Sequence, residues 1–255
     1  MGVSINTNKT LGVSRGSKII APQTSAFTNV YSTDFDGVDD YVDCGTFAAL
    51  NSATALTLSV WFKSSVYTTS GRLVNLEKHV EIYQSNAAYG NTRGRFYYKL
   101  MGNYGNGFKT LGGTSASGVG NLCDGNWHHL CFVWDNSTTT SVVYEDGVAV
   151  ITDTSTTGIL NSVSDTFYIG ADPSGANAIE GNIDEVAVFN SALSSSDITA
   201  IYNSGVPNDL NNNGLTAPIN WWRFEEGSGT TAIDSGSSTN NGTLTNGVAY
   251  STDVP

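Results

Sequence analysis

Apolar and polar residues alternate in short runs along the chain after residue 30, and turn-forming residues separate these runs. The run 55–63 (ALTLSVWFK) is apolar at Leu56, Leu58, Val60 and Phe62, which is the two-residue period of a strand with one buried face. The run 127–134 (WHHLCFVW) is the most apolar of these segments, and the turn that follows it predicts residues 140–145 as its antiparallel partner.

The same reasoning extends over the rest of the chain. An Asp146-Gly147 turn indicates a tight hairpin, because glycine tolerates the positive φ that such a turn needs. The sequence also predicts one helix over 194–202, with Ser194 or Ser195 as its N-cap and Gly205 and Pro207 after its end. The remaining predicted strands are 94–100, 148–152, 166–170, 181–189 and one that begins the tail at 221–224. These elements predict an all-β antiparallel sandwich of the jelly-roll type, with one short helix near 194–203.

Composition narrows the function classes. Only 13% of the 255 residues are charged and 28 are glycine, which leaves little material for exposed helix faces. A formal net charge of −12 argues against binding to nucleic acid or to an anionic membrane, since both need clustered Lys and Arg. The first ten residues lack the apolar stretch of a secretory signal. Three cysteines without CxxC spacing (Cys44, Cys123 and Cys131) predict reduced thiols and synthesis in a cytosol, with Cys131 filling core space.

The first 30 residues differ from the rest. They are polar, mildly basic and too poor in apolar residues to fold alone, so we expect an extended arm over 1–30 and a single sandwich over 31–255. A partner could hold this arm, or it could lie along its own sandwich. Residues expected to bind a partner are Lys9, Arg15, Lys18, Ile19 and Ile20.

Five blocks in a fixed order resemble a laminin-G-like domain of the concanavalin A-like lectin/glucanase type. They are Phe35-Asp36-Gly37-Val38-Asp39-Asp40-Tyr41-Val42, Thr57 to Phe62, Gly125 to Leu130, Tyr144 to Gly147, and Gly181 to Ser194. The combination is specific for the fold and much less so for a function. The resemblance implies a jelly roll.

The tail departs from this family pattern. The segment Trp221 to Thr231, followed by Asp234, resembles the family's first strand, which normally precedes the Phe35-Asp36-Gly37 block. We therefore expect residues 220–255 to supply that strand from the C-terminal side, as in a circular permutation. The alternative is a truncated second repeat, but about 35 residues are too few for a core of their own.

This arrangement resembles laminin-G-like proteins of tailed-phage virions. It implies a non-enzymatic structural or decoration protein on a capsid or fibre, assembled in the host cytoplasm and attached to other virion proteins through its arm. The alternative function is a lectin-like, carbohydrate-binding adhesion module, and the two are compatible.

Two aspartates are candidate metal ligands. Strict alternation places Asp184 on the same face as Val186, beside core positions. The family resemblance implies a structural Ca²⁺ there, held by Asp184 and by the turn that contains Asp36, since calcium needs six to eight oxygen ligands. The alternative is that Asp184 only accepts backbone amides from this turn.

Other motifs point to structure rather than chemistry. Residues 209–214 match the start of an EF-hand loop, but Asn220 stands where the bidentate Glu belongs, so an Asx-rich turn is expected. His128 and His129 are neighbours on a strand and should face opposite ways.

No enzymatic activity is expected. Asp184 and Glu185 should likewise lie on opposite faces, so the carboxylate pair of a retaining glycosidase is not formed.

Two loops remain candidates for sugar contacts. Residues 88–94 and 103–108 carry aromatic side chains among Asn and Gly, a composition suited to sugar binding. The alternative is ordinary packing of surface rings on the sandwich rim. The candidate residues are Tyr89, Arg93, Tyr104 and Phe108.

Overall fold

The computed structural model describes most of the sandwich. The described residues are 27–76, 79–85, 95–100, 109–111, 122–158, 160, 165–212 and 214–255. The arm residues Lys9, Arg15, Lys18, Ile19 and Ile20 and the loop residues Tyr89, Arg93, Tyr104 and Phe108 lie outside them.

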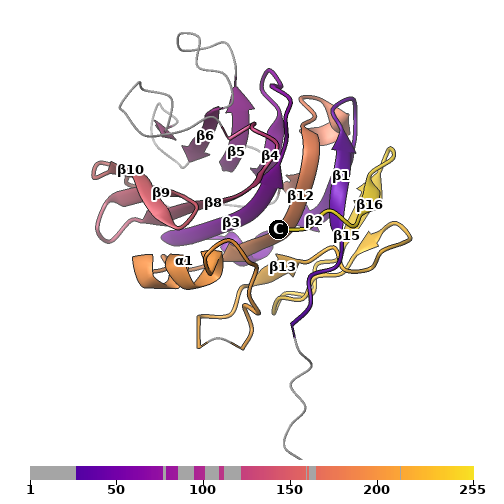
Figure 1. The fold of residues 1–255 in the computed structure, drawn as a ribbon. Coiled ribbons are helices and arrows are strands. Elements are labelled where there is room, and N and C mark those ends of the chain that lie inside the picture. Colours follow the sequence, from indigo (N-terminus) through magenta and orange to yellow (C-terminus); the bar gives the residue numbers. More distant parts are fainter. Residues whose placement is uncertain are drawn as a thin grey trace, which may run out of the picture.

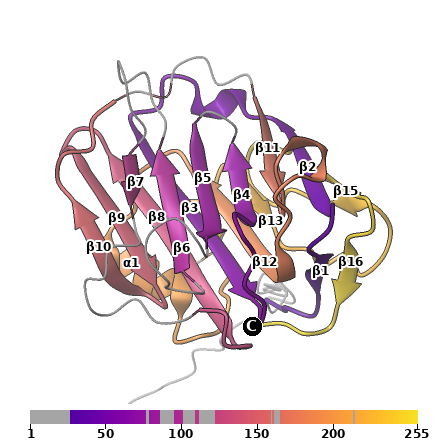
Figure 2. The same ribbon diagram turned by 90° about the horizontal axis from the view of Figure 1, so that it is seen from above.

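Two antiparallel sheets pack face to face, and one short helix covers the outer face of the first sheet (Figure 1 and Figure 2). The predicted all-β sandwich with a single short helix is thereby confirmed for the described residues. In strand order, the first sheet contains β10 (Val148–Asp153), β9 (Thr140–Glu145), β8 (Trp127–Asp135), β3 (Ala55–Lys63), β12 (Glu180–Phe189), β1 (Ser32–Asp36) and β16 (Ala249–Ser251), and β13 (Asn220–Trp222) also pairs with β12.

The second sheet packs against the inner face of the first (Figure 2). Its strands, in order, are β14 (Thr231–Ala232), β15 (Gly242–Thr245), β2 (Tyr41–Thr46), β11 (Thr166–Ile169), β4 (Arg72–Leu76), β5 (Val80–Ser85), β6 (Arg95–Leu100) and β7 (Lys109–Leu111). Short 3₁₀ turns at Ala48–Leu50 and Pro173–Gly175 complete the described elements, and none of the described helices is long and apolar enough to span a bilayer.

The main core lies between the sheets. The neighbouring strands β3 and β8 both send alternate side chains into this core. Leu58 of β3 pairs with Phe132 of β8, and both residues point inward. Trp222 of β13 stacks on Phe167 of the opposite sheet with ring centroids 5.5 Å apart. A smaller apolar cluster lies on the outer face of the first sheet under the helix and includes Cys131, which is fully buried as predicted.

The C-terminal tail contributes more than the one strand that the sequence indicates. Four short strands lie within 220–255, and they join both sheets: β13 pairs with β12, β16 pairs with β1, and β15 pairs with β2. The tail strands therefore complete the same two sheets instead of forming a separate unit.

Strict alternation fails in β12. The pairing of β12 with β3 shifts register between Asp184 and Ala187, and Glu185 adopts a positive φ of 49°. This is the geometry of a β-bulge, which adds one residue to one strand. As a result, Ile183 and Val186 both enter the inter-sheet core, and the prediction that Asp184 shares a face with Val186 was wrong.

The helix α1 (Ser195–Tyr202) begins at a capping box. Ser194 is the N-cap, its hydroxyl accepts from the Asp197 backbone N–H at 3.3 Å, and the Asp197 side chain accepts from the Ser194 N–H at 3.0 Å. The helix ends at Asn203, whose left-handed φ of 44° stops it before Gly205. Ile198 and Ile201 of α1 pack onto the outer face of the first sheet.

Candidate functional site

A cleft of about 310 Å³ opens at Trp221, on the outer-face side of the first sheet. Its walls come from three separate parts of the chain: the segment just before β1, the loop after α1, and the tail around β13. The lining residues that carry its chemistry are Phe27, Asp209, Asn211, Asn212, Arg223 and Ser235. A volume near 300 Å³ is at the lower end for sites that hold small molecules, roughly 300–1,000 Å³.

The segment 27–31, here termed the strap, forms one wall of the cleft. The ring of Phe27 stacks on Trp221, with centroids 6.2 Å apart and planes within 7°. The Asn29 side-chain amide donates to Asp184 at 2.9 Å. The backbone N–H groups of Val30 and Tyr31 both donate to Glu225, at 2.9 and 3.1 Å.

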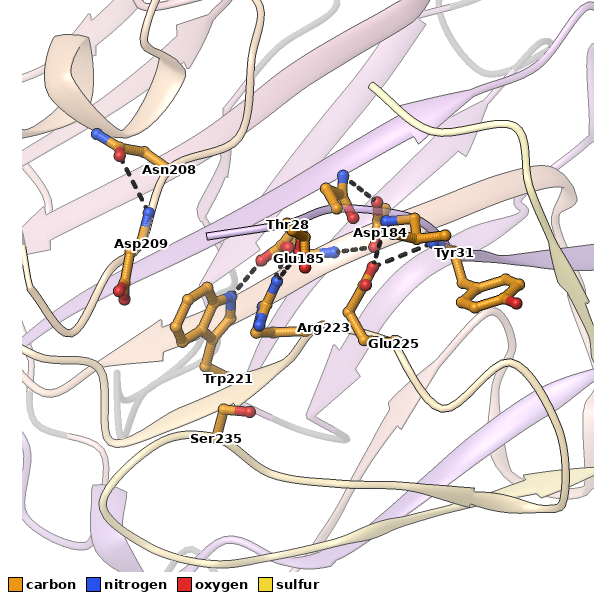
Figure 3. A network of polar contacts seen from close by, with 12 residues as sticks. Thr28, Tyr31, Asp184, Glu185, Asn208, Asp209, Trp221, Arg223, Glu225 and Ser235 are labelled. Carbon is orange, nitrogen blue, oxygen red and sulfur yellow. Dashed lines mark hydrogen bonds and ion pairs between the residues drawn. The ribbon is translucent and has the colours of Figure 1, made fainter. Parts of the chain in front are cut away.

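Arg223 joins the strap to the tail. Its Nη2 donates to the Thr28 carbonyl, and its Nε lies 3.4 Å from the carboxylate of Glu185. Its guanidinium carbon lies 4.4 Å from the Phe27 ring centroid and 5.1 Å from that of Trp221. Figure 3 shows Arg223 and Trp221 both directed toward Glu185. The cation is thus engaged by the protein itself.

Beneath the strap lies a carboxyl pair that strand alternation does not predict. The bulge turns Asp184 and Glu185 to the same outer face, so the expectation that they face opposite ways was wrong. Asp184 is 0% exposed and Glu185 is 3% exposed. Burial, reinforced by the charge of Glu185, raises the pKa of Asp184 well above its usual range, and burial raises the pKa of Glu185 to about 8 against the opposing effect of Arg223.

The burial of this pair limits its chemistry. The Trp221 indole N–H donates to Glu185 at 2.5 Å, and the Glu185 backbone N–H donates to Asp184 at 2.8 Å. A glycosidase needs both carboxyl groups at the scissile bond of its substrate. These two carboxyl groups are covered, and their contacts attach the strap and β13 to the sheet.

The loop 209–212 lines the opposite side of the cleft as an Asx turn, as predicted. Asp209 Oδ1 accepts the Asn211 backbone N–H at 3.0 Å, and Oδ2 accepts the Asn212 side-chain amide at 2.5 Å. The Asn211 side chain donates to the Ser235 carbonyl at 3.0 Å, which fixes the loop to the tail. Asn211 and Asn212 are both exposed, and both line the cleft.

The two predicted calcium ligands lie apart. Asp36 pairs with Glu180 and Thr33 with Ile183, so Asp184 lies about four residues, roughly 13 Å, from Asp36 along β1. Asp36 instead lies with Asp39 and Asp40, and ligand atoms from these three residues lie within 4.8 Å of one another.

This aspartate group could hold a cation such as Ca²⁺. Asp40 is only 2% exposed, and its Oδ1 is buried without a hydrogen-bond partner, while its Oδ2 accepts the Asp36 backbone N–H at 3.0 Å. Burial raises the pKa of Asp40, and the neighbouring carboxylates add to the effect. A hard cation with oxygen ligands fits this set, with Asp36, Asp39 and Asp40 as the residues that would hold it.

The histidine pair is structural. His129 is buried under α1, its Nε2 lies 2.8 Å from the Ser59 hydroxyl, and burial lowers its pKa to about 4. His128 Nδ1 lies 2.8 Å from Asp146, and this hydrogen bond raises its pKa. The two imidazoles therefore have different partners, as expected for neighbours on a strand.

Sequence reasoning did not single out the cleft. Arg223 stood in the predicted tail strand and Asp209 in the predicted turn, but no spacing along the chain relates them to Phe27. The predicted sugar-contact loops lie outside the described residues.

Comparison with known proteins now adds to this geometry. A family model of laminin-G type, described as the concanavalin A-like lectin/glucanases superfamily, matches residues 36–199. The chain belongs to this superfamily. No curated protein sequence matches significantly.

Several solved structures share the superfamily fold. A candidate carbohydrate-binding protein of Bacteroides ovatus superposes with a TM-score of 0.67 at 18% identity, covering 90% of this chain, which spans 62% of that protein's length. The heptameric SAP-like pentraxin of Limulus polyphemus gives 0.55 at 16% identity, covering 87% of this chain and 94% of the pentraxin. The Ruminococcus gnavus sialidase module CBM40, bound to α2,3-sialyllactose, gives 0.52 at 15% identity and covers 67% and 96% of the two chains. At these identities the likeness concerns the fold.

Proposed function

We propose that this member of the superfamily is a non-enzymatic, lectin-like carbohydrate-binding module. The observation that carries the proposal is the outer-face cleft, which combines a partly accessible ring with amide, hydroxyl and carboxylate groups. Ligand sites of this kind orient a small molecule by a few placed polar groups around an apolar surface. Proteins of the same fold that bind carbohydrate, such as the CBM40 module with its sialyllactose, support this reading.

The absence of catalysis is part of the proposal. Asp184 and Glu185 are neighbouring carboxyl groups near the cleft, and both are buried: Asp184 accepts from Asn29 of the strap, and Glu185 accepts from Trp221. A carboxyl pair buried to this extent favours a structural role.

A glycan array probed with the full chain tests the proposal, with a hydrolysis assay on every glycan that binds. Binding without hydrolysis is expected. Absence of binding to any glycan, with and without added calcium, overturns the proposed function, and release of sugar from a bound glycan overturns its non-enzymatic part.

We also propose that the module is displayed on a virus particle, assembled in the host cytoplasm, with the arm as its attachment to other virion proteins. The observation in favour is the strap, which lies directly after the arm in the chain and is fastened to the sandwich by Asp184, Arg223 and Glu225. A segment fastened in this way would transmit the pull of an attached arm to the sheet.

The test deletes residues 2–26 and leaves the strap in place. Co-sedimentation of the deleted and full chains is then measured with phage particles that lack the protein, after equal thermal unfolding has shown that both are folded. Loss of co-sedimentation is expected for the deleted chain. Equal attachment of both chains, or attachment of neither, contradicts the virion proposal.

A further inference from the structure

We propose that the outer-face cleft binds an uncharged sugar residue, with Phe27 as the stacking ring and Asp209 as the acceptor for its hydroxyl groups. This inference rests on the proposed carbohydrate-binding function and adds the class of ligand and the residues that select it.

The charge at the cleft disfavours an acidic sugar. Arg223 lines the cleft as its cation, and two of its five N–H donors already bind the Thr28 carbonyl and Glu185, which leaves fewer of them for a carboxylated sugar. The carboxylate of Asp209 lines the same cleft, and Glu225 binds the neighbouring strap. The chain as a whole carries −12, so an anion approaches against both the local and the overall charge.

The same groups suit hydroxyls. Asp209 accepts one contact on each carboxylate oxygen, and each oxygen retains a second acceptor position. Hydroxyl groups of a neutral sugar can donate to these positions and to the side-chain carbonyls of Asn211 and Asn212. Ser235 adds a hydroxyl group, which both donates and accepts. Charge-assisted hydrogen bonds from hydroxyls to a carboxylate are about twice as strong as neutral ones.

Phe27 supplies the apolar surface. Trp221 is only 2% exposed, whereas Phe27 is half-buried and lines the cleft. The Trp221 ring supports Phe27 from one side, and the guanidinium of Arg223 lies 4.4 Å from its centroid, so the ring is held in place before a ligand arrives. A ring ordered in advance loses little conformational entropy on binding.

The experiment measures glycan binding by the full chain and by matched variants. An array of neutral oligosaccharides and of oligosaccharides with uronic or sialic acid identifies the ligand class. Titration calorimetry with the best ligand then compares the wild type with Phe27→Ala and Asp209→Asn. Asp43→Asn is the control, because Asp43 makes the same type of turn contact, to the Gly45 N–H at 2.9 Å, in the opposite sheet.

Neutral glycans are expected to bind and acidic ones not to bind. Phe27→Ala and Asp209→Asn should each weaken binding about tenfold or more, and Asp43→Asn should leave the affinity unchanged. Preferential binding of acidic glycans overturns the inference. Wild-type affinity of the Asp209→Asn variant also overturns it. This result counts by itself, because Phe27→Ala could weaken binding merely by loosening the strap. Either result leaves the proposed function standing, whereas absence of binding to any glycan overturns both.

Discussion

Asp234 holds the C-terminal tail to β13, and its removal is the sharpest test of how the tail is fixed. Its Oδ1 accepts the backbone N–H groups of Trp221 and Gly236, at 2.7 and 2.8 Å. Its Oδ2 accepts the Asn220 side-chain amide at 2.6 Å and the Asn240 N–H at 2.8 Å. The substitution Asp234→Ala removes all four acceptor contacts at once.

The loss in the free energy of unfolding depends on which of the four donors find no other hydrogen-bond partner. Trp221 and Asn220 are 2% and 0% exposed, so the Trp221 backbone N–H and the Asn220 side-chain amide stay buried without a partner in the variant. Each unsatisfied buried donor lowers stability by about 1–3 kcal/mol. The donors of Gly236 and Asn240 belong to half-buried residues and can turn to water. Asp234→Ala should therefore lower the free energy of unfolding by about 4 kcal/mol, a large share of the roughly 5–15 kcal/mol typical of a domain.

Urea unfolding followed by tryptophan fluorescence measures this loss, since Trp221 and Trp222 are both buried next to the substitution. Asp234→Asn, which keeps the shape and one acceptor oxygen, should cost about half as much. Asp43→Ala is the control, because it removes the single turn contact to the Gly45 N–H instead of four contacts, and it should cost less than about 1 kcal/mol. If Asp234→Ala costs no more than Asp43→Ala, the tail is fixed by other means and this reasoning is refuted.

Three further predictions concern protons and metal. Burial raises the pKa of Glu185 to about 8 in the folded protein, from 4.5 without burial, so the stability that its proton contributes should be lost as the pH rises between these values. In urea unfolding, the free energy of unfolding of Glu185→Gln should therefore rise relative to that of the wild type by about 1.4 kcal/mol per pH unit across this range. If the difference in unfolding free energy between the two proteins stays constant with pH, the buried proton is contradicted. By NMR, the His129 imidazole should stay neutral until the pH approaches about 4, while His128 titrates above its usual 6.5; the reverse order would contradict the burial of His129. Added Ca²⁺ should raise the melting temperature of the wild type relative to chelator, and Asp40→Asn should abolish the rise; equal melting temperatures of the wild type in both conditions argue against a calcium site at Asp36, Asp39 and Asp40.

Local patterns were sufficient to locate two central strands, although 55–63 was predicted to have one buried face and the structure buries both faces. The segment 55–63 was predictable as a strand from its alternating residues and 127–134 from its apolar character, and in the structure the two strands pair over their full length. The helix was predictable because Ser194 and Asp197 form a local capping box. Such signals involve residues a few positions apart, so they can be read without knowledge of the fold.

The bulge at Glu185 shows where this reasoning stops. Strict alternation separates Asp184 from Glu185, but the burial of both Ile183 and Val186 in the inter-sheet core requires an extra residue in β12. The cost of the positive φ at Glu185 is offset by packing of the whole strand, which no window of sequence contains.

The sequence by itself thus determined the class of fold, several of its strands, the helix and the superfamily, because these follow from periodicity, turn chemistry and local motifs. Only the tertiary structure decided that the tail completes both sheets and that Phe27, Asp209 and Arg223 meet in one cleft. Segments nearly 200 residues apart approach each other there because the neighbouring strands β1 and β13 both pair with β12, and contacts such as that of Thr28 with Arg223 depend on this pairing.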